Sequence, residues 1–192
     1  AMEELIPNTG YSEIGLLSLS SSDYTQIIEL VESINQHFAG KNIAISLPSL
    51  RIESVSVDLM DALSGKRRGG FTLAPEAASS RLRKIINKPI SDQQLLDTAA
   101  EIFQRGWHTI KLYFMIGHPS ETLEDVQAIA DLSQEVLNRG NSIIGHRAQV
   151  HVSVSTFVPK PHTPFQWVKT DSIPEITAKL DLLQNQIRGK GL

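Results

Sequence analysis

The chain has 192 residues, of which 41% are hydrophobic, and its formal net charge is −3. This hydrophobic fraction suffices for one domain with a sizeable core, and the small negative charge gives no electrostatic case for nucleic acid as a partner. The chain contains no cysteine, which excludes disulfides, thiolate zinc sites and iron–sulfur ligation by its own residues. No apolar run is long enough to span a membrane and no signal-peptide pattern opens the chain, so we expect a cytoplasmic protein.

The first residues, AMEELIPNTGYSE, lack an initiator methionine at position 1. This predicts a segment cut from a longer protein, with Ala1 left over from cloning; a complete small protein is the alternative. We expect a single domain over residues 1–192, in which residues 168–192 include a C-terminal helix.

Segments with strand character and segments with helix character alternate five times along the chain. Strands are predicted at five places: residues 13–20, 42–47, 70–74, 108–116 and 148–157. This alternation predicts an α/β fold with a mainly parallel sheet in sequential strand order.

Capping residues and glycines predict where the helices begin and end. Ser22 or Asp23 is predicted to cap a helix that runs to Ala39, and Ser91 opens another helix with a capping box. The helix that follows the fourth strand is predicted to end at Gly140, because glycine is the commonest residue just past a helix C-terminus.

The two faces of the predicted strands differ in polarity. The strand at residues 148–157 has valines on one face and, on the other, Gln149, His151, Ser153, Ser155 and Phe157. A parallel sheet with helices on both faces should be apolar on both. The pattern therefore favours a partial (β/α) barrel, similar to a TIM barrel, with helices on its outer face and a ligand in its lumen. An antiparallel edge or a face open to solvent is the alternative.

The most informative stretch is residues 107–126, WHTIKLYFMIGHPSETLEDV. It reads as a buried strand, a glycine–proline turn and the first turn of a helix that Ser120 or Thr122 can cap. Ligands bind at the C-terminal ends of strands in such units. The turn at residues 117–121 is therefore a candidate site, and Gly117 would let a ligand approach the backbone closely.

Two other stretches contain residues suited to binding. Glu76 lies between a strand end and a helix N-terminus, where backbone N–H groups bind anions; a helix-capping carboxylate is the alternative. The proline-rich residues 157–167 could contact a substrate through Lys160, His162 and Trp167, or could only close the domain.

Lys111 could form a Schiff base, although a polar lumen residue is the plainer interpretation. The histidines have no helical partner four residues away, so no metal site is predicted.

Four segments share their order and spacing with a known family: EIGLLSLSSSDY at 13–24, LAPEAASSRLRKIINK at 73–88, LYFMIGHPSETLEDV at 112–126 and STFVPKPHTPFQW at 155–167. Together they resemble the radical S-adenosylmethionine (SAM) enzymes, in particular uncharacterised members that often carry an N-terminal cobalamin-binding domain, and more distantly the methylthiotransferases. The resemblance spans about residues 12–168. It implies a partial (β/α)₆ barrel whose first strand precedes a loop with three cysteines that bind a [4Fe–4S] cluster. The chain would then comprise strands two to six, without the cluster-binding part.

The resemblance implies roles for several residues in binding SAM. Ser20 stands where the family contacts the methionine amino group, although the usual Gly-Gly-Glu is absent. Glu76 stands at a Glu/Gln position near the cofactor, and Lys88 matches a basic position that pairs with the methionine carboxylate in some members.

Other matches lie near the adenosine in the family. Met115 and Gly117 match positions that flank adenine, whereas Tyr113 replaces an acidic ribose ligand of some relatives. Ser155, at the end of the last strand, is expected at the same edge of the sheet. Substrate-binding residues are expected in the lumen and in the loop beyond it: His151, Lys160 and His162.

The resemblance implies that the intact protein cleaves SAM reductively at a [4Fe–4S] cluster and abstracts hydrogen from an unknown substrate. SAM, the cluster and the missing N-terminal part of the protein are the implied partners, with cobalamin on a separate domain as an option. We expect the chain alone to bind no iron and to be inactive. The alternatives are a cluster-free binding module on the same fold and a (β/α) lyase that uses Lys111.

Overall fold

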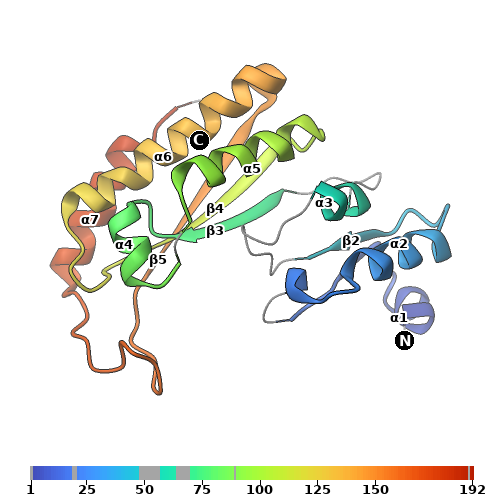
Figure 1. Cartoon of the computed structure of the whole chain (residues 1–192), viewed down its shortest axis with the longest axis horizontal. Coiled ribbons are helices and arrows are strands. Elements are labelled where there is room, and N and C mark those ends of the chain that lie inside the picture. The colour runs from blue at the N-terminus through green and yellow to red at the C-terminus, as the bar shows by residue number, and fades with distance from the viewer. Residues whose placement is uncertain (1, 19–20, 48–56, 64–69, 89, 190) are drawn as a thin grey trace. The chain divides into compact units, whose positions relative to one another are not determined.

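We describe a computed structural model of the whole chain, which defines residues 2–18, 21–47, 57–63, 70–88, 90–189 and 191–192 (Figure 1). The chain divides into two compact units, Ala1–Gly69 and Gly70–Leu192. The prediction of a single domain over the whole chain stays a prediction. None of the described helices is both long and apolar enough to cross a membrane.

The first unit contains two short parallel strands and the helices that follow them. Its elements are α1 (Met2–Thr9), β1 (Glu13–Gly15), η1 (Ser21–Asp23), α2 (Ile27–His37), β2 (Ala44–Ser46) and α3 (Val57–Leu63). β1 pairs with β2 in parallel register. Apolar residues recur every three to four positions along α2 and bury one side of that helix. They join a small core formed by Ile27, Val31, Leu47 and Leu59.

The predicted start of α2 at Ser22 or Asp23 is wrong. Residues Ser21–Asp23 form a separate 3₁₀ turn, and α2 begins at Ile27 after Gln26, whose side chain makes no capping hydrogen bond. The hydroxyl of Ser21 instead donates to the carbonyl of Leu16 at 3.2 Å. Ser21 therefore ties the chain back to the residue after β1, and this segment does not start the helix.

The second unit is a three-stranded parallel sheet with its helices. Its elements are β3 (Phe71–Glu76), α4 (Ser80–Ile85), α5 (Asp92–Gln104), β4 (Thr109–Ile116), α6 (Leu123–Ile144), η3 (Gly145–Arg147), β5 (Gln149–Thr156) and α7 (Ile173–Gln186). The strand order is β3-β4-β5. Each crossover from one strand to the next contains at least one helix, as parallel neighbours require.

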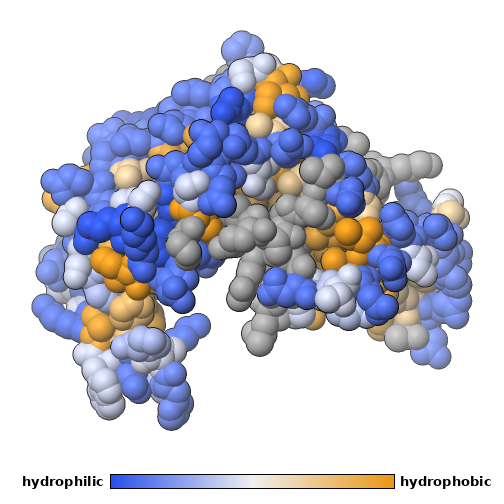
Figure 2. Space-filling view, viewed as in Figure 1, coloured by the Kyte–Doolittle hydropathy of each residue, from blue (hydrophilic) through white to orange (hydrophobic). Residues whose placement is uncertain are grey.

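One face of this sheet forms the core of the second unit. Alternate residues of β4 are fully buried, and the residues between them are half-buried or exposed. α5 and α6 pack side by side, and α6 also contacts β4 and β5 (Figure 1). Most of the surface seen in Figure 2 is hydrophilic, with hydrophobic residues in scattered patches. The apolar residues of the strands are therefore covered by helices on one side, and the polar residues lie on the other.

The α/β class with parallel strands and helices is confirmed. The five strands among the described residues lie in two sheets, β1-β2 and β3-β4-β5, with no pairing between the sheets that would close a barrel. The partial barrel stays a prediction. β1 is shorter than its predicted range of residues 13–20, whereas β4 and β5 match their predicted ranges within one residue.

The predicted end of α6 at Gly140 is wrong, because α6 continues to Ile144. A Cβ atom at position 140 would lie 2.7 Å from two ring atoms of Phe103 and 2.8 Å from the Cβ of Ala148. Gly140 therefore allows α6 to approach α5 and the start of β5. The helix ends one turn later at Gly145, whose φ is 67°.

Candidate functional site

β3 ends in a strained turn at Glu76. The φ angle of Glu76 is 66°, and the N–H of Ala77 donates to the carbonyl of Pro75 at 2.8 Å. A hydrogen bond between residues two apart, around a residue with positive φ, defines the rare form of γ-turn. The pairing of β3 with β4 shifts between Leu73 and Glu76, and Pro75, which has no N–H to pair, suits such an irregularity. Strained non-glycine residues of this kind cluster at functional sites.

Lys88 returns to this strand end because α4 ends in a chain reversal. Its N–H donates to the carbonyl of Arg83 at 2.7 Å, and the N–H of Asn87 donates to the carbonyl of Lys84 at 3.2 Å. Asn87 has a φ of 55°. These two bonds and the left-handed residue form a Schellman motif. The motif turns the chain back towards β3.

The ammonium of Lys88 lies 3.6 Å from Oε1 of Glu76 and donates to the carbonyl of Ala74. The side chains of Glu76 and Lys88 are 32% and 24% exposed. The pair is therefore accessible, and it presents both charges at one edge of the sheet.

β4 leads into the turn at residues 117–121, which lies at the same edge. Gly117 and Ser120 have φ angles of 84° and 63°. The N–H of Gly117 donates to Oε2 of Glu121 at 2.7 Å. Thr122 forms a capping box with Asp125 at the start of α6, so of the two predicted caps Thr122 is correct and Ser120 is not.

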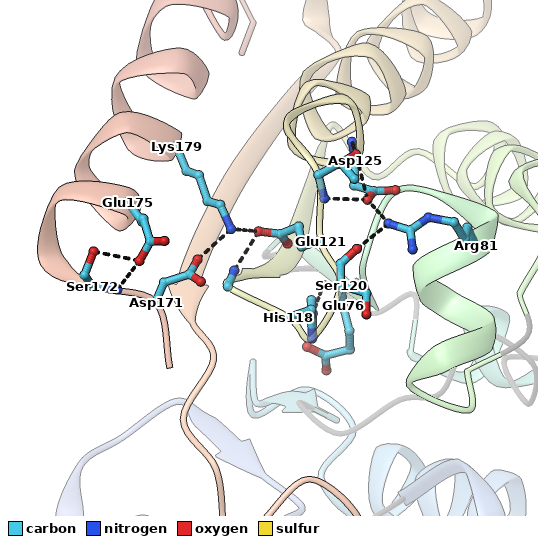
Figure 3. A network of polar contacts seen from close by, with 12 residues as sticks. Glu76, Arg81, His118, Ser120, Glu121, Asp125, Asp171, Ser172, Glu175 and Lys179 are labelled. Atoms are coloured by element: carbon cyan, nitrogen blue, oxygen red, sulfur yellow. Dashed lines mark hydrogen bonds and ion pairs between the residues drawn. The ribbon is translucent and has the colours of Figure 1, made fainter. Parts of the chain in front are cut away.

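The α4 side of this turn is held by Arg81. Its guanidinium donates to the carbonyl of Ser120 at 2.7 Å and forms an ion pair with the buried Asp125 (Figure 3). Asp125 also accepts from the hydroxyl of Ser79 at 2.5 Å. α4 and the start of α6 are therefore joined through one carboxylate.

Burial by itself would raise the pKa of Asp125. Hydrogen bonds from the Ser79 hydroxyl, the Thr122 backbone and Arg81 outweigh burial and hold that pKa below its usual value. The charged form of Asp125 is therefore the form that the fold favours.

Asp125→Asn is expected to lower the unfolding free energy at pH 7 by about 1.5–3 kcal/mol, the contribution of hydrogen bonds to a charged group. A lowered folded pKa stabilises the protein above the unfolded value of about 3.9 and loses that contribution as pH falls through the folded pKa. The variant should therefore lose less stability than the wild type between about pH 5 and pH 3. Urea unfolding across this range measures it, with the exposed Asp131→Asn on the same helix as control. Parallel pH profiles of Asp125→Asn and wild type would contradict the assignment.

The other side of the turn is held by α7. Nζ of Lys179 lies 2.5 Å from Oε2 of Glu121 and 2.6 Å from Oδ2 of Asp171 (Figure 3). Burial would lower the pKa of Lys179, but the hydrogen bonds to Asp171 and Glu121 raise it above its usual value. Lys179 therefore stays charged and connects α7 to the turn.

Packing within the chain gives a further reason for glycine at position 117, and its predicted role beside a ligand stays a prediction. A Cβ there would lie 3.3 Å from Oδ2 of Asp171 and 3.4 Å from Cδ1 of Ile176. The space that a side chain would fill is therefore occupied from the α7 side, and the positive φ adds a second requirement for glycine.

The strand order places the predicted residues of β4 and β5 beside this turn. Met115 and Ser155 are direct partners across the sheet, on the face opposite the core. Glu76 pairs with Phe114, and Gly117 follows the last residue of β4. The C-terminal ends of all three strands therefore converge at one edge, with Lys88 beside them.

The family model of the radical SAM superfamily matches residues 1–133 of the chain. This chain belongs to the radical SAM superfamily. An uncharacterised protein of Methanocaldococcus jannaschii is 30% identical over 190 residues, which are 99% of this chain and 39% of that protein. The chain thus spans well under half the length of this relative.

A solved structure shows the same fold. Coproporphyrinogen III oxidase (HemN) from Escherichia coli, described as a radical SAM enzyme, matches 92% of this chain and 39% of its own with a TM-score of 0.60. The sequence identity is 15%, so this similarity concerns the fold alone.

The cofactors of radical SAM proteins are SAM and a [4Fe–4S] cluster, and the residues present fit only the first. Glu76 and Lys88 are a carboxylate and an ammonium at the strand ends, which suit the zwitterionic methionine end of SAM. The chain has no cysteine, and its described residues contain no group of three or more metal-binding side chains. The described residues therefore provide no ligand set for the cluster.

The other predicted residues are not joined to the Glu76–Lys88 pair by a contact among the described residues. Ser20 lies outside the described residues. His151 is the partner of Lys111 near the start of β5, about 13 Å along the strand from Ser155 at 3.3 Å per residue. Lys160 and His162 are exposed in the loop after β5. That loop is braced internally, since the Thr163 hydroxyl donates to the Lys160 carbonyl at 2.7 Å.

Two buried residues beside Glu76 were missed by the sequence analysis. His118 has Nε2 3.5 Å from the Glu76 carbonyl, and its ring lies 5.8 Å from that of Phe157. Arg83 on α4 is 1% exposed. The partner of His118 is a carbonyl that only the fold brings near. The partners of Arg83 lie close in the sequence, but no periodic pattern shows that its side chain is buried against them.

Proposed function

We propose that this chain forms the SAM-binding part of a radical SAM enzyme, with Glu76 holding the methionine amino group and Lys88 the carboxylate. The Glu76–Lys88 pair at the strand ends is the observation that carries the proposal. Its separation of 3.6 Å exceeds the roughly 2.7–2.9 Å of a tight charge-assisted hydrogen bond. A zwitterionic ligand would offer each group a partner of opposite charge at shorter range.

The neighbouring strand ends fit the remainder of SAM in this proposal. Met115 and Ser155 would lie beside the adenosine, and the polar face of β3-β4-β5 would face the substrate. The residues Lys160, His162 and His151 would contact that substrate or the path to it. The chain's own part in the reaction is to orient the bound molecules and exclude water.

A [4Fe–4S] cluster, when bound, supplies the electron for reductive cleavage of SAM. We propose that its cysteine ligands lie in parts of the full-length protein beyond these 192 residues, because the chain has none. A cobalamin-binding domain in the full-length protein is a further part of the proposal, supported by the sequence resemblance and testable by the visible absorption spectrum.

The test uses the full-length protein, purified without oxygen, with SAM and dithionite. We expect iron and sulfide in the protein and release of 5′-deoxyadenosine. Glu76→Gln and Lys88→Met should each raise the dissociation constant for SAM about 10- to 100-fold, since a hydrogen bond to a charged group contributes about 1.5–3 kcal/mol.

Lys84→Met is the matched control, because Lys84 is an exposed lysine of α4, four residues before Lys88. If Glu76→Gln and Lys88→Met both bound SAM with the wild-type dissociation constant, neither residue would belong to the SAM site. Full-length protein without iron would favour the cluster-free binding module on the same fold.

A further inference from the structure

The turn at Glu76 needs support, because a non-glycine residue with positive φ persists only where its surroundings over-determine it. Four carbonyls of this short segment accept hydrogen bonds from side chains or lie near a donor. Lys88 binds the carbonyl of Ala74, and His118 lies 3.5 Å from that of Glu76. The carbonyls of Ala77 and Ala78 face Arg83.

Arg83 makes two of these contacts. Its Nη1 donates to the carbonyl of Ala78 at 2.7 Å and to that of Ala77 at 3.3 Å. Its Nη2 donates to the Ser80 hydroxyl at 3.2 Å and forms an ion pair with Asp92. One guanidinium therefore links the residues after the γ-turn to the start of α4 and to the start of α5.

The burial of Arg83 is not explained by stability. A buried charge is costly even when paired, and an apolar residue of similar size often stabilises a protein as well or better. Nε of Arg83 is buried without a hydrogen-bond partner among the described residues. The gain from an arginine here is geometric, since Nη1 of its planar guanidinium donates to two successive carbonyls while Nη2 of the same group reaches Ser80 and Asp92.

We propose that Arg83 is a positioning residue, which holds the γ-turn and thereby aims the Glu76 carboxylate at SAM. The proposal rests on the proposed role of Glu76 in binding SAM. Arg83 also anchors the other half of the pair, because its own carbonyl accepts from the N–H of Lys88 at 2.7 Å. The side chain and main chain of one residue thus set the positions of both charges.

A double-mutant cycle on the anaerobically purified full-length protein tests this. Arg83→Met should raise the dissociation constant for SAM about tenfold, whereas the double variant Arg83→Met/Glu76→Gln should bind no worse than Glu76→Gln alone. Non-additivity is expected of residues that act as one unit. Arg139→Gln, which removes an exposed arginine with a loose 4.0 Å contact to Asp97, should leave SAM affinity unchanged.

A second readout does not depend on SAM. The Ala77 N–H that closes the γ-turn should exchange with solvent at least tenfold faster in Arg83→Met than in wild type, and at the wild-type rate in Arg139→Gln. Arg83→Lys keeps the charge but not the planar guanidinium, so its SAM affinity and its Ala77 exchange rate should lie between those of wild type and Arg83→Met. It replaces Arg83→Met in both experiments if the methionine variant does not fold.

Additive effects on SAM binding, or unchanged exchange at Ala77 in a folded Arg83 variant, would overturn the proposal. If the wild-type protein binds no SAM, the proposed function is wrong, and so is the proposal that Arg83 positions the Glu76 carboxylate for SAM. The exchange of Ala77 would then still show whether Arg83 holds the turn.

Discussion

Lys179→Met is expected to lower the unfolding free energy by about 3–5 kcal/mol, the usual cost of removing one partner from a buried charge network. The side chains of Lys179 and Glu121 are 11% and 2% exposed. Without the ammonium, the carboxylates of Glu121 and Asp171 would face each other with no cation between them. The turn at residues 117–121 would lose its connection to α7.

Urea unfolding measures this effect, with the exposed Lys169→Met as control. Adding Glu121→Gln should recover part of the loss, because it removes the unpaired buried charge. The raised pKa of Lys179 means that its contribution is complete below the unfolded value of about 10.4 and declines as pH rises through the folded pKa. A loss below 1 kcal/mol at pH 7 would show that the network does not hold α7.

Gly140→Val is expected to destabilise the second unit by about 3 kcal/mol, the upper end of the usual cost of overpacking. The new Cβ would lie 2.7 Å from the ring of Phe103 and 2.8 Å from the Cβ of Ala148. Neither neighbour can withdraw easily, because Phe103 is fully buried on α5 and Ala148 precedes β5.

Thermal and urea unfolding measure the change at Gly140. Asn138→Val introduces the same β-branched residue at an exposed position of the same helix, without these contacts. Helix propensity alone would favour valine over glycine at position 140, so a loss of stability there reports the packing. Equal stability of the two variants would mean that α6 does not pack against α5 as described.

Local patterns predicted the parts of the fold that depend on near neighbours. Alternation of polar and apolar residues located β4 and β5, and the serine at position 91 marked the start of α5 with the predicted capping box. The prediction that α6 ends at Gly140 is wrong because this glycine is needed to make room for Phe103, which lies on another helix. Its role depends on packing between elements, and no periodicity within α6 contains that information.

In the candidate site, too, the sequence indicated some residues and not others. Glu76, Lys88 and the turn at residues 117–121 were indicated by strand ends and by a family resemblance. Their supports were not, since Lys179 contacts a carboxylate from a distant part of the chain, and no sequence pattern marks Arg83 as buried. From the sequence alone, Arg83 and Lys179 look like surface residues, because charged side chains are mostly exposed. Only the fold shows that both are buried against polar partners.

The most direct test of the SAM-binding proposal is a crystal structure of the full-length protein grown with SAM under anaerobic conditions. We expect the methionine amino group within hydrogen-bonding distance of Glu76 and the carboxylate within hydrogen-bonding distance of Lys88, with the Glu76–Lys88 contact lengthened or broken. A methionine moiety bound elsewhere, with Glu76 and Lys88 still paired at their present separation of 3.6 Å, would contradict it.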